Sequence, residues 1–133
     1  MTAHITTEMA VLGWSLVLFL VYMMVQAAAA LRDRGVAFNA GPRDEPGPLG
    51  PMAARAERAF ANFRETWPAF IALALGLAVT GRSGGVAATG AWIWLAARVA
   101  YLPLYLLGIP YVRTLSWGAA AAGLVMMALR LFF

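Results

Sequence analysis

The sequence predicts an all-α membrane protein, a bundle of four transmembrane helices in a single domain over residues 1–133. Two observations carry this prediction. The 133 residues are 62% apolar and only 12% charged, with a mean hydropathy of +0.74, whereas about a quarter of the residues of a soluble domain are charged. The apolar residues also gather in long uncharged runs, as membrane-spanning helices require. A soluble enzyme is therefore excluded.

Residue types that are missing or rare exclude several other chemistries. The chain has no cysteine, and its single histidine is His4, near the amino terminus. Disulfides, a cysteine nucleophile and thiolate metal sites are thereby excluded, and we expect no bound metal. The net charge of +4 comes from ten arginines without any lysine, spread among apolar runs rather than clustered, so nucleic-acid binding is not expected. A lysine-free chain rich in Ala, Gly, Pro and Arg favours a bacterial source.

The first predicted helix covers residues 8–31. Met9 to Leu31 is a run of 23 residues without a charge, which is long enough to cross the hydrocarbon core of a bilayer. The run is too long for a signal peptide, and the residues before it contain Glu8 but no positive charge. We therefore expect a membrane span that stays in the protein.

Residues 35–51 form the long polar loop of the chain. Seven of the eleven residues from Gly41 to Pro51 are Gly or Pro, which do not continue a helix. The amino-terminal tail has no Lys or Arg, and the opposite loop has only Arg82. The arginines in or beside the long loop are Arg32, Arg34, Arg43, Arg55 and Arg58. The positive-inside rule then predicts a cytoplasmic loop, with both termini in the periplasm of a bacterial inner membrane.

Three further helices are predicted at about 53–80, 86–109 and 111–132. The remaining uncharged runs have only 14 to 16 residues each, which is too short to span a bilayer alone. The helices become long enough to span if the second one extends back to residue 53 and the runs on either side of Arg98 join into one helix. The solution places charged side chains on the second and third helices at or below headgroup depth, where such residues are usually functional.

The second helix carries a polar stripe. At about 100° per residue, Arg58, Asn62 and Glu65 lie within roughly 60° of one another, and such a stripe must face protein or water. One interpretation is a polar cluster that satisfies itself and fixes helix packing. Arg58 and Glu65 are about 10 Å apart along the axis, too far for a good direct pair. We therefore expect another helix, or a ligand carrying both signs of charge, between them.

The third helix carries a second stripe, formed by Arg98, Tyr101 and Tyr105 at positions i, i+3 and i+7. Tyrosines of a membrane helix often anchor it at the interface, but an arginine in line with them favours a polar site. Arg113 follows the break at residues 108–110, where the fourth helix begins. A single arginine there is also compatible with snorkelling to lipid headgroups.

These motifs resemble the MAPEG family, the membrane-associated proteins of eicosanoid and glutathione metabolism, which include the microsomal glutathione transferases. The first matching motif is Arg58-x-x-x-Asn62-x-x-Glu65 followed by Trp67-Pro68. The second is Arg98-x-x-Tyr101-x-x-x-Tyr105 with Arg113 downstream. Size, four spans and orientation agree as well, so the resemblance covers essentially the whole chain. Residues 41–45 and 108–114 resemble the bacterial branch of the family.

The resemblance implies a homotrimer of four-helix subunits, with glutathione as co-substrate in a cleft between neighbouring subunits. Carried over by position, Arg58, Asn62 and Glu65 bind glutathione from one subunit, and Arg98, Tyr101 and Tyr105 bind it from the next. Arg113 corresponds to the catalytic arginine that stabilises the thiolate. Arg32 corresponds to a glutathione-binding arginine at the end of the first helix.

The implied activity is that of a transferase or peroxidase, in which the glutathione thiolate attacks a lipophilic electrophile. Arginines suit the two carboxylates of glutathione and Glu65 suits its ammonium. Two positions depart from the pattern, because Thr66 stands where several members have tyrosine and Phe60 where a polar residue helps to bind glutathione. The alternative is a non-catalytic member of the fold that binds a lipid or a membrane partner. A small transporter subunit is less favoured, since no internal repeat is seen.

Overall fold

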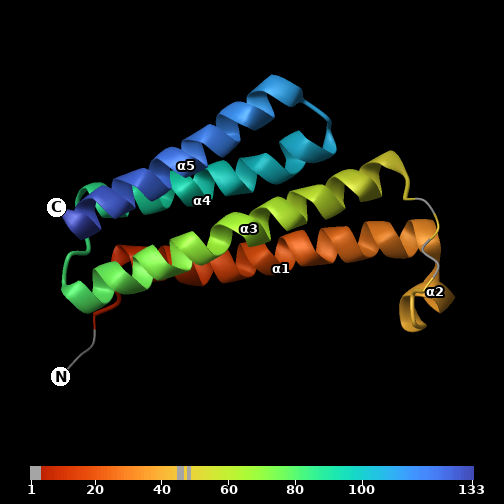
Figure 1. Cartoon of the computed structure of the whole chain (residues 1–133), viewed down its shortest axis with the longest axis horizontal. Helices are drawn as coiled ribbons and strands as arrows, with labels where there is room; N and C mark the ends of the chain where they lie inside the picture. Colours follow the sequence, from red (N-terminus) through yellow and green to blue (C-terminus); the bar gives the residue numbers. More distant parts are fainter. Residues whose placement is uncertain (1–3, 45–46, 48) are drawn as a thin grey trace.

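The structure, a computed structural model, describes residues 4–44, 47 and 49–133. All regular secondary structure in these residues is helical, which confirms the predicted all-α class. The helices are α1 (Thr7–Arg34), α2 (Val36–Ala40), α3 (Pro51–Thr80), α4 (Val86–Leu106) and α5 (Pro110–Phe132). The four long helices alternate in direction along one bundle (Figure 1). Both termini and the α3–α4 connection lie at one end of the bundle, and α2 and the α4–α5 turn lie at the other.

The long helices lie where the sequence predicts them, and each end differs from the predicted one by at most three residues. The five-residue helix α2 forms within the segment predicted as a loop; residues 45, 46 and 48 of that loop lie outside the described residues. The third long helix ends at Leu106 instead of residue 109. Gly108 has a φ of 71°, in the left-handed region that favours glycine. Pro110 then occupies the first turn of α5, where its missing N–H removes no helical hydrogen bond.

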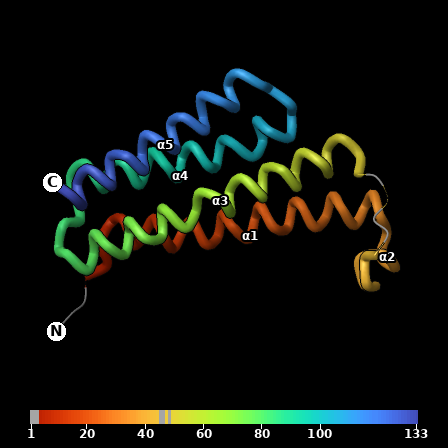
Figure 2. Tube along the Cα trace, viewed as in Figure 1, coloured from red at the N-terminus to blue at the C-terminus, as the bar shows by residue number. Residues whose placement is uncertain are grey.

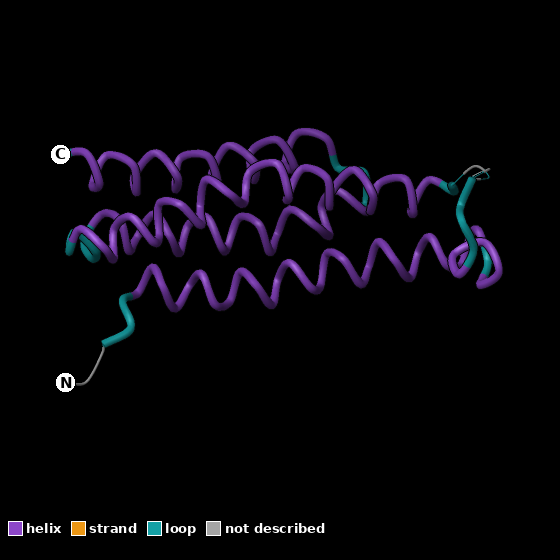
Figure 3. Tube along the Cα trace, turned by 60° about the horizontal axis from the view of Figure 1, so that its bottom comes forward, coloured by secondary structure: helices purple, strands orange, loops and turns teal. Residues whose placement is uncertain are grey.

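The helices associate as two antiparallel pairs, α1 with α3 and α4 with α5 (Figure 2). Figure 3 shows that the described segments between the helices are loops and turns, without strands. A core of aromatic side chains joins the first pair to α4. Phe70 of α3 stacks on Trp94 of α4 with ring centroids 4.0 Å apart, and Trp67 stacks on Phe19 of α1 at 4.8 Å. Trp67 Nε1 also donates to Ser15 Oγ at 2.9 Å. These contacts hold α3, with its polar stripe, against α1 and α4.

The amino-terminal end of α1 is fixed to the α3–α4 connection by a buried carboxylate. Glu8 is fully buried, and its Oε1 accepts the backbone N–H of Gly84 at 2.7 Å. Thr6 caps the same helix, since its Oγ1 accepts the N–H of Met9 at 3.2 Å. The bundle is therefore tied at the end that holds both termini.

The α4–α5 pair is the most extensive helix contact, and two glycines make it possible. A Cβ atom on Gly123 would lie 2.5 Å from the carbonyl oxygen of Gly90 and 3.0 Å from the backbone nitrogen of Trp94. Real Cβ atoms do not approach backbone this closely. The two helices therefore meet backbone to backbone, as small residues allow in membrane proteins.

We expect Gly123→Ala to destabilise the bundle, because the added methyl group meets backbone that cannot move without separating α4 from α5. Overpacking of this kind costs about 1–3 kcal/mol. Gly118→Ala on the same helix is the matched control, since nothing lies within 4 Å of a Cβ at that position. Thermal denaturation in detergent should show a lower Tm for Gly123→Ala than for Gly118→Ala. Equal Tm values would contradict the close packing.

By length and composition, α1 and α5 are each apolar enough to cross a membrane. Only 17% of the most apolar stretch of α5 is buried inside the chain, so this helix turns an apolar surface outward. α3 and α4 do not meet the same criterion, and both carry charged residues along their length (Arg64 and Glu65 on α3, Arg98 on α4). The structure thus shows two apolar spans, and the crossing of all four long helices stays a prediction.

Candidate functional site

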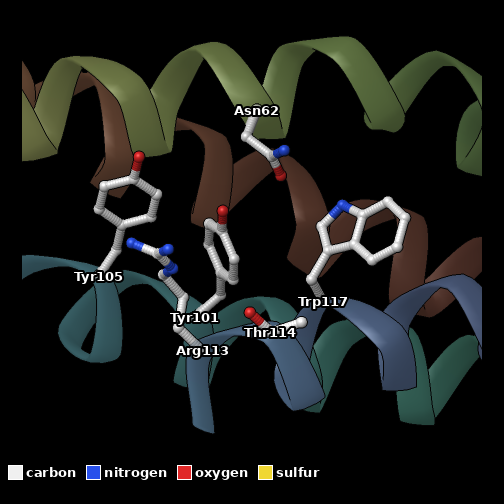
Figure 4. Close-up of a pocket in the computed structure, with 6 residues that line it drawn as sticks. All are labelled: Asn62, Tyr101, Tyr105, Arg113, Thr114 and Trp117. Carbon is white, nitrogen blue, oxygen red and sulfur yellow. The ribbon is translucent and has the colours of Figure 1, made fainter. Parts of the chain in front are cut away.

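Four polar residues of the sequence motifs line a cavity of about 260 Å³ between α3, α4 and α5. Figure 4 shows the side chain of Asn62 reaching from α3 toward two tyrosines that rise from α4. The remaining wall comes from the first turns of α5. The lining residues are Asn62, Tyr101, Tyr105, Arg113, Thr114 and Trp117. Three long helices therefore contribute to one site.

Arg98 lies behind this cavity and orients Asn62. It is fully buried, and its Nη1 donates to Asn62 Oδ1 at 2.9 Å. Its guanidinium carbon is 4.6 Å from the ring centroid of Tyr101 and 5.3 Å from that of Phe63, distances at which a cation is attracted to an aromatic face. Because the carbonyl oxygen of the Asn62 amide accepts from Arg98, its NH₂ group is available to donate to a ligand.

Two other arginines flank the ring of Tyr105. Arg58 Nε donates to Tyr105 Oη at 3.2 Å, and the guanidinium carbon of Arg113 lies 4.5 Å from the centroid of the same ring. Among the described residues, the one ion pair joins Arg32 to Asp33 at 3.7 Å. Arg113 therefore brings a positive charge to the cavity, and Arg58 brings a second one to Tyr105 in its wall. Neither has an acidic partner among the described residues, which favours an anionic ligand.

Glu65 lies on α3 three residues after Asn62, and its side chain is exposed. It forms no ion pair with Arg58 in the described structure, as the spacing along the helix predicts. The stripe on α3 thus presents separated positive and negative groups, which is the arrangement that a zwitterionic ligand requires.

The two stripes contact each other within one chain, and the expected contribution of a neighbouring subunit to the glutathione site stays a prediction. The hydrogen bonds from Arg98 to Asn62 and from Arg58 to Tyr105 both join α3 to α4 of the same chain. The short α3–α4 connection places these helices side by side, so their polar faces come together without a second subunit. Arg32 lies apart from them, at the end of α1, with a side chain that is 73% exposed.

Sequence reasoning missed Thr114 and Trp117. Both line the cavity, and they follow Arg113 at i+1 and i+4 on α5. This spacing puts the three residues on one side of the helix and is the signal that would have found them. Arg55, which the sequence places beside the long loop, donates through Nη1 to the carbonyl oxygen of Leu106 at 3.2 Å. It thereby fixes the end of α4 next to the site.

The two positions that depart from the motif lie outside the wall of this cavity. Phe60 is buried in the aromatic core, with its ring 5.5 Å from that of Phe19. Thr66 donates through Oγ1 to the carbonyl oxygen of Asn62 at 3.2 Å. Neither position places a polar group into this cavity.

Long apolar helices around a cluster of arginines and tyrosines define the class: a helical membrane protein with an anion-attracting cavity inside the bundle. The chain belongs to the MAPEG family, whose sequence model matches residues 9–133. It is therefore a membrane protein of the family of eicosanoid and glutathione metabolism, as its motifs indicate. In comparisons with curated proteins and with solved structures, nothing matches the chain.

Proposed function

We propose that this protein is a glutathione-dependent membrane transferase or peroxidase that acts on lipophilic electrophiles. One observation carries the proposal: Asn62, Tyr105 and Arg113 line a single cavity, and Arg58 donates to the hydroxyl of Tyr105. Neither arginine has an acidic partner among the described residues. Membership of a family that typically uses glutathione supports the choice of ligand.

The charges along α3 suit those of glutathione. The peptide has two carboxylates and one ammonium group, and an extended tripeptide spans roughly 10 Å. Arg58 and Glu65 are separated by about the same distance along the helix axis. We propose that arginines bind the carboxylates through charge-assisted hydrogen bonds, that Glu65 binds the ammonium, and that the Asn62 NH₂ group donates to an oxygen between them.

Arg113 is the proposed catalytic residue. A free thiol has a pKa near 8.5, so only a few per cent is ionised at neutral pH. A cation that lowers the pKa of the bound thiol by about one unit, equivalent to about 1.4 kcal/mol, raises the thiolate fraction nearly tenfold. The chain then needs no nucleophile of its own, in keeping with its lack of cysteine.

The reaction follows from the thiolate. With a halogenated or otherwise activated substrate, the sulfur forms a bond to carbon and the leaving group departs with the electron pair of the broken bond. With a lipid hydroperoxide, the sulfur attacks the terminal oxygen and the O–O bond breaks. This gives the sulfenic acid of glutathione and an alkoxide, which takes up a proton from water and leaves as an alcohol. A second glutathione then converts the sulfenic acid to glutathione disulfide and water.

We further propose a homotrimer in a bacterial inner membrane, with residues 35–51 in the cytoplasm and both termini in the periplasm. The placement of both termini at one end of the bundle is consistent with an even number of crossings (Figure 1). Arg32 supports the assembly, because it lies away from the cavity of its own chain and is largely exposed. In a trimer it would serve the site of a neighbouring subunit.

Calorimetry of the detergent-purified protein with glutathione tests the proposal. We expect saturable binding, and conjugation of glutathione to a chlorodinitrobenzene-type electrophile. Arg58→Ala should abolish measurable binding while the oligomer elutes unchanged. Arg64→Ala is the matched control, since Arg64 is exposed on the same helix and its guanidinium carbon lies 4.5 Å from the Phe60 ring centroid. A flat titration of the folded protein at millimolar glutathione would instead support a non-catalytic member that binds a lipid or a membrane partner.

A further inference from the structure

A hollow of about 240 Å³ lies at the arginine-rich end of α1, where α2 packs against it. Figure 1 shows α2 beside this end of α1, at the end of the bundle away from both termini. The wall of this α1–α2 hollow includes Ala27, Ala30, Leu31 and Arg34 of α1, Asn39 of α2, and Arg43. It shares no lining residue with the cavity between α3, α4 and α5, so it is a separate feature of the chain.

Two arginines form the polar side of the α1–α2 hollow. Arg34 Nε donates to the carbonyl oxygen of Gly47 at 3.3 Å, and its guanidinium carbon lies 5.4 Å from the Phe38 ring centroid. Arg43 Nε donates to the carbonyl oxygen of Asn39 at 3.1 Å. Because each of these hydrogen bonds uses only Nε, the Nη groups of both side chains can donate to a ligand. Arg43 is exposed and Arg34 is half-buried, so a ligand can reach both from outside.

The charges of these two arginines are not neutralised within the described part of the chain. Asp33 is next to Arg34 in the sequence, but its Oδ1 pairs with Arg32 at 3.7 Å and its Oδ2 accepts the backbone N–H of Gly50 at 2.8 Å. Neither Arg34 nor Arg43 forms an ion pair with a described residue. Two such guanidinium groups at one hollow attract an anion, and their N–H donors suit a phosphate group.

The apolar side of the α1–α2 hollow continues as a stripe along α1. At about 100° per residue, the stripe that ends at Arg34 stays within about 80° of the helix circumference. Its members are all exposed, and they are Leu20, Met24, Ala27 and Leu31. The stripe covers about 16 Å of the helix axis, which is about half of the roughly 30 Å hydrocarbon core and hence the depth of one leaflet. Since α1 is long and apolar enough to cross a membrane, an anion that fits both sides of the hollow carries a hydrocarbon chain.

We propose that the α1–α2 hollow binds the headgroup of an anionic glycerophospholipid. The phosphate is held between the guanidinium groups of Arg34 and Arg43, and one acyl chain lies along the stripe of α1. Basic pockets beside membrane helices are typical binding sites for anionic headgroups. A free phosphate would use the arginines alone and leave the apolar side of the hollow without a partner.

Lipid binding to the purified protein in neutral detergent, without glutathione, tests this site separately from the proposed function. The titrants are phosphatidylglycerol, phosphatidylcholine with the same acyl chains, and inorganic phosphate. We expect saturable binding of phosphatidylglycerol and at least tenfold weaker binding of phosphatidylcholine, because arginines near a membrane surface attract lipids with a net negative charge. Inorganic phosphate should not displace the bound lipid at equal concentration. Equal affinity for the two lipids, or displacement by inorganic phosphate, would overturn the proposal.

Variants locate the lipid on the chain. Arg34→Gln and Arg43→Gln should each raise the Kd for phosphatidylglycerol about five- to tenfold, the loss expected for one arginine near a membrane surface. Arg43 is exposed, so its replacement leaves the packing of the bundle intact. Arg32→Gln is the matched control: it removes the same charge at the same end of α1, from a side chain that is 73% exposed and lies outside the hollow. It should leave this Kd nearly unchanged. Equal weakening in Arg32→Gln and Arg43→Gln, or no weakening in any variant, would contradict a site in the α1–α2 hollow.

Discussion

Replacing Arg113 by leucine is expected to lower the rate of glutathione conjugation at neutral pH about tenfold, because the bound thiol loses the cation that lowers its pKa by about one unit. Arg113 lines the cavity, and its guanidinium carbon is 4.5 Å from the Tyr105 ring centroid. The effect has a definite pH dependence. A thiol with a lowered pKa is ionised at neutral pH, whereas the variant needs a higher pH, so the two rates should converge above the ordinary thiol pKa of about 8.5.

The measurement is kcat/KM against pH, together with the ultraviolet absorbance of the bound thiolate. The titration midpoint should rise by about one unit in Arg113→Leu. Arg130→Leu is the control, because Arg130 is an exposed arginine in the last turn of the same helix, where its Nε donates to the carbonyl oxygen of Arg82. If Arg113→Leu leaves both profiles unchanged, Arg113 reaches toward lipid headgroups and another group stabilises the thiolate.

The second large effect is expected at Glu65. Glu65→Gln keeps the size of the side chain and removes the negative charge proposed to bind the ammonium of glutathione. A hydrogen bond to a charged group contributes about 1.5–3 kcal/mol, so glutathione affinity should fall roughly 10- to 100-fold. Titration calorimetry measures the change. Glu57→Gln serves as the control, since Glu57 is also exposed on α3 but lies two turns earlier.

A modified ligand makes this prediction sharper. Glutathione acetylated on its amino group has no ammonium, so wild-type protein should bind it as weakly as Glu65→Gln binds glutathione. The variant should discriminate little between the two ligands. Equal affinity of wild-type protein for both ligands would show that Glu65 does not bind the ammonium, even if the variant were weakened for another reason.

The helices could be predicted from the sequence because a bilayer imposes a simple length requirement. Uncharged runs, together with the Gly/Pro-rich loop at residues 35–51 and the break at residues 108–110, mark the long helices to within a few residues. Helical periodicity also identified the stripes that contain Asn62 and Tyr105, since one face of a helix recurs every three to four residues. The short helix α2 has no such signal, because five residues are too few to show a period.

The arrangement of the site required the structure. Periodicity shows which residues share a face, but not which faces meet, so the contact of Asn62 with Arg98 inside one chain was not predictable. Periodicity also does not show how deeply a side chain is buried. Arg98 and Tyr101 share a stripe, but Arg98 is fully buried and Tyr101 lines the cavity between α3, α4 and α5. In the sequence, Trp117 is one of many apolar residues of a predicted span. The packing of α5 against α4 is what brings it into the wall of the cavity.

The most direct test of the account is a structure of the protein in lipid with glutathione bound. We predict the peptide in the cavity between α3, α4 and α5, with its carboxylates toward Arg58 and its sulfur beside Arg113. Clear density for glutathione outside this cavity, with these arginines facing lipid headgroups, would contradict the account.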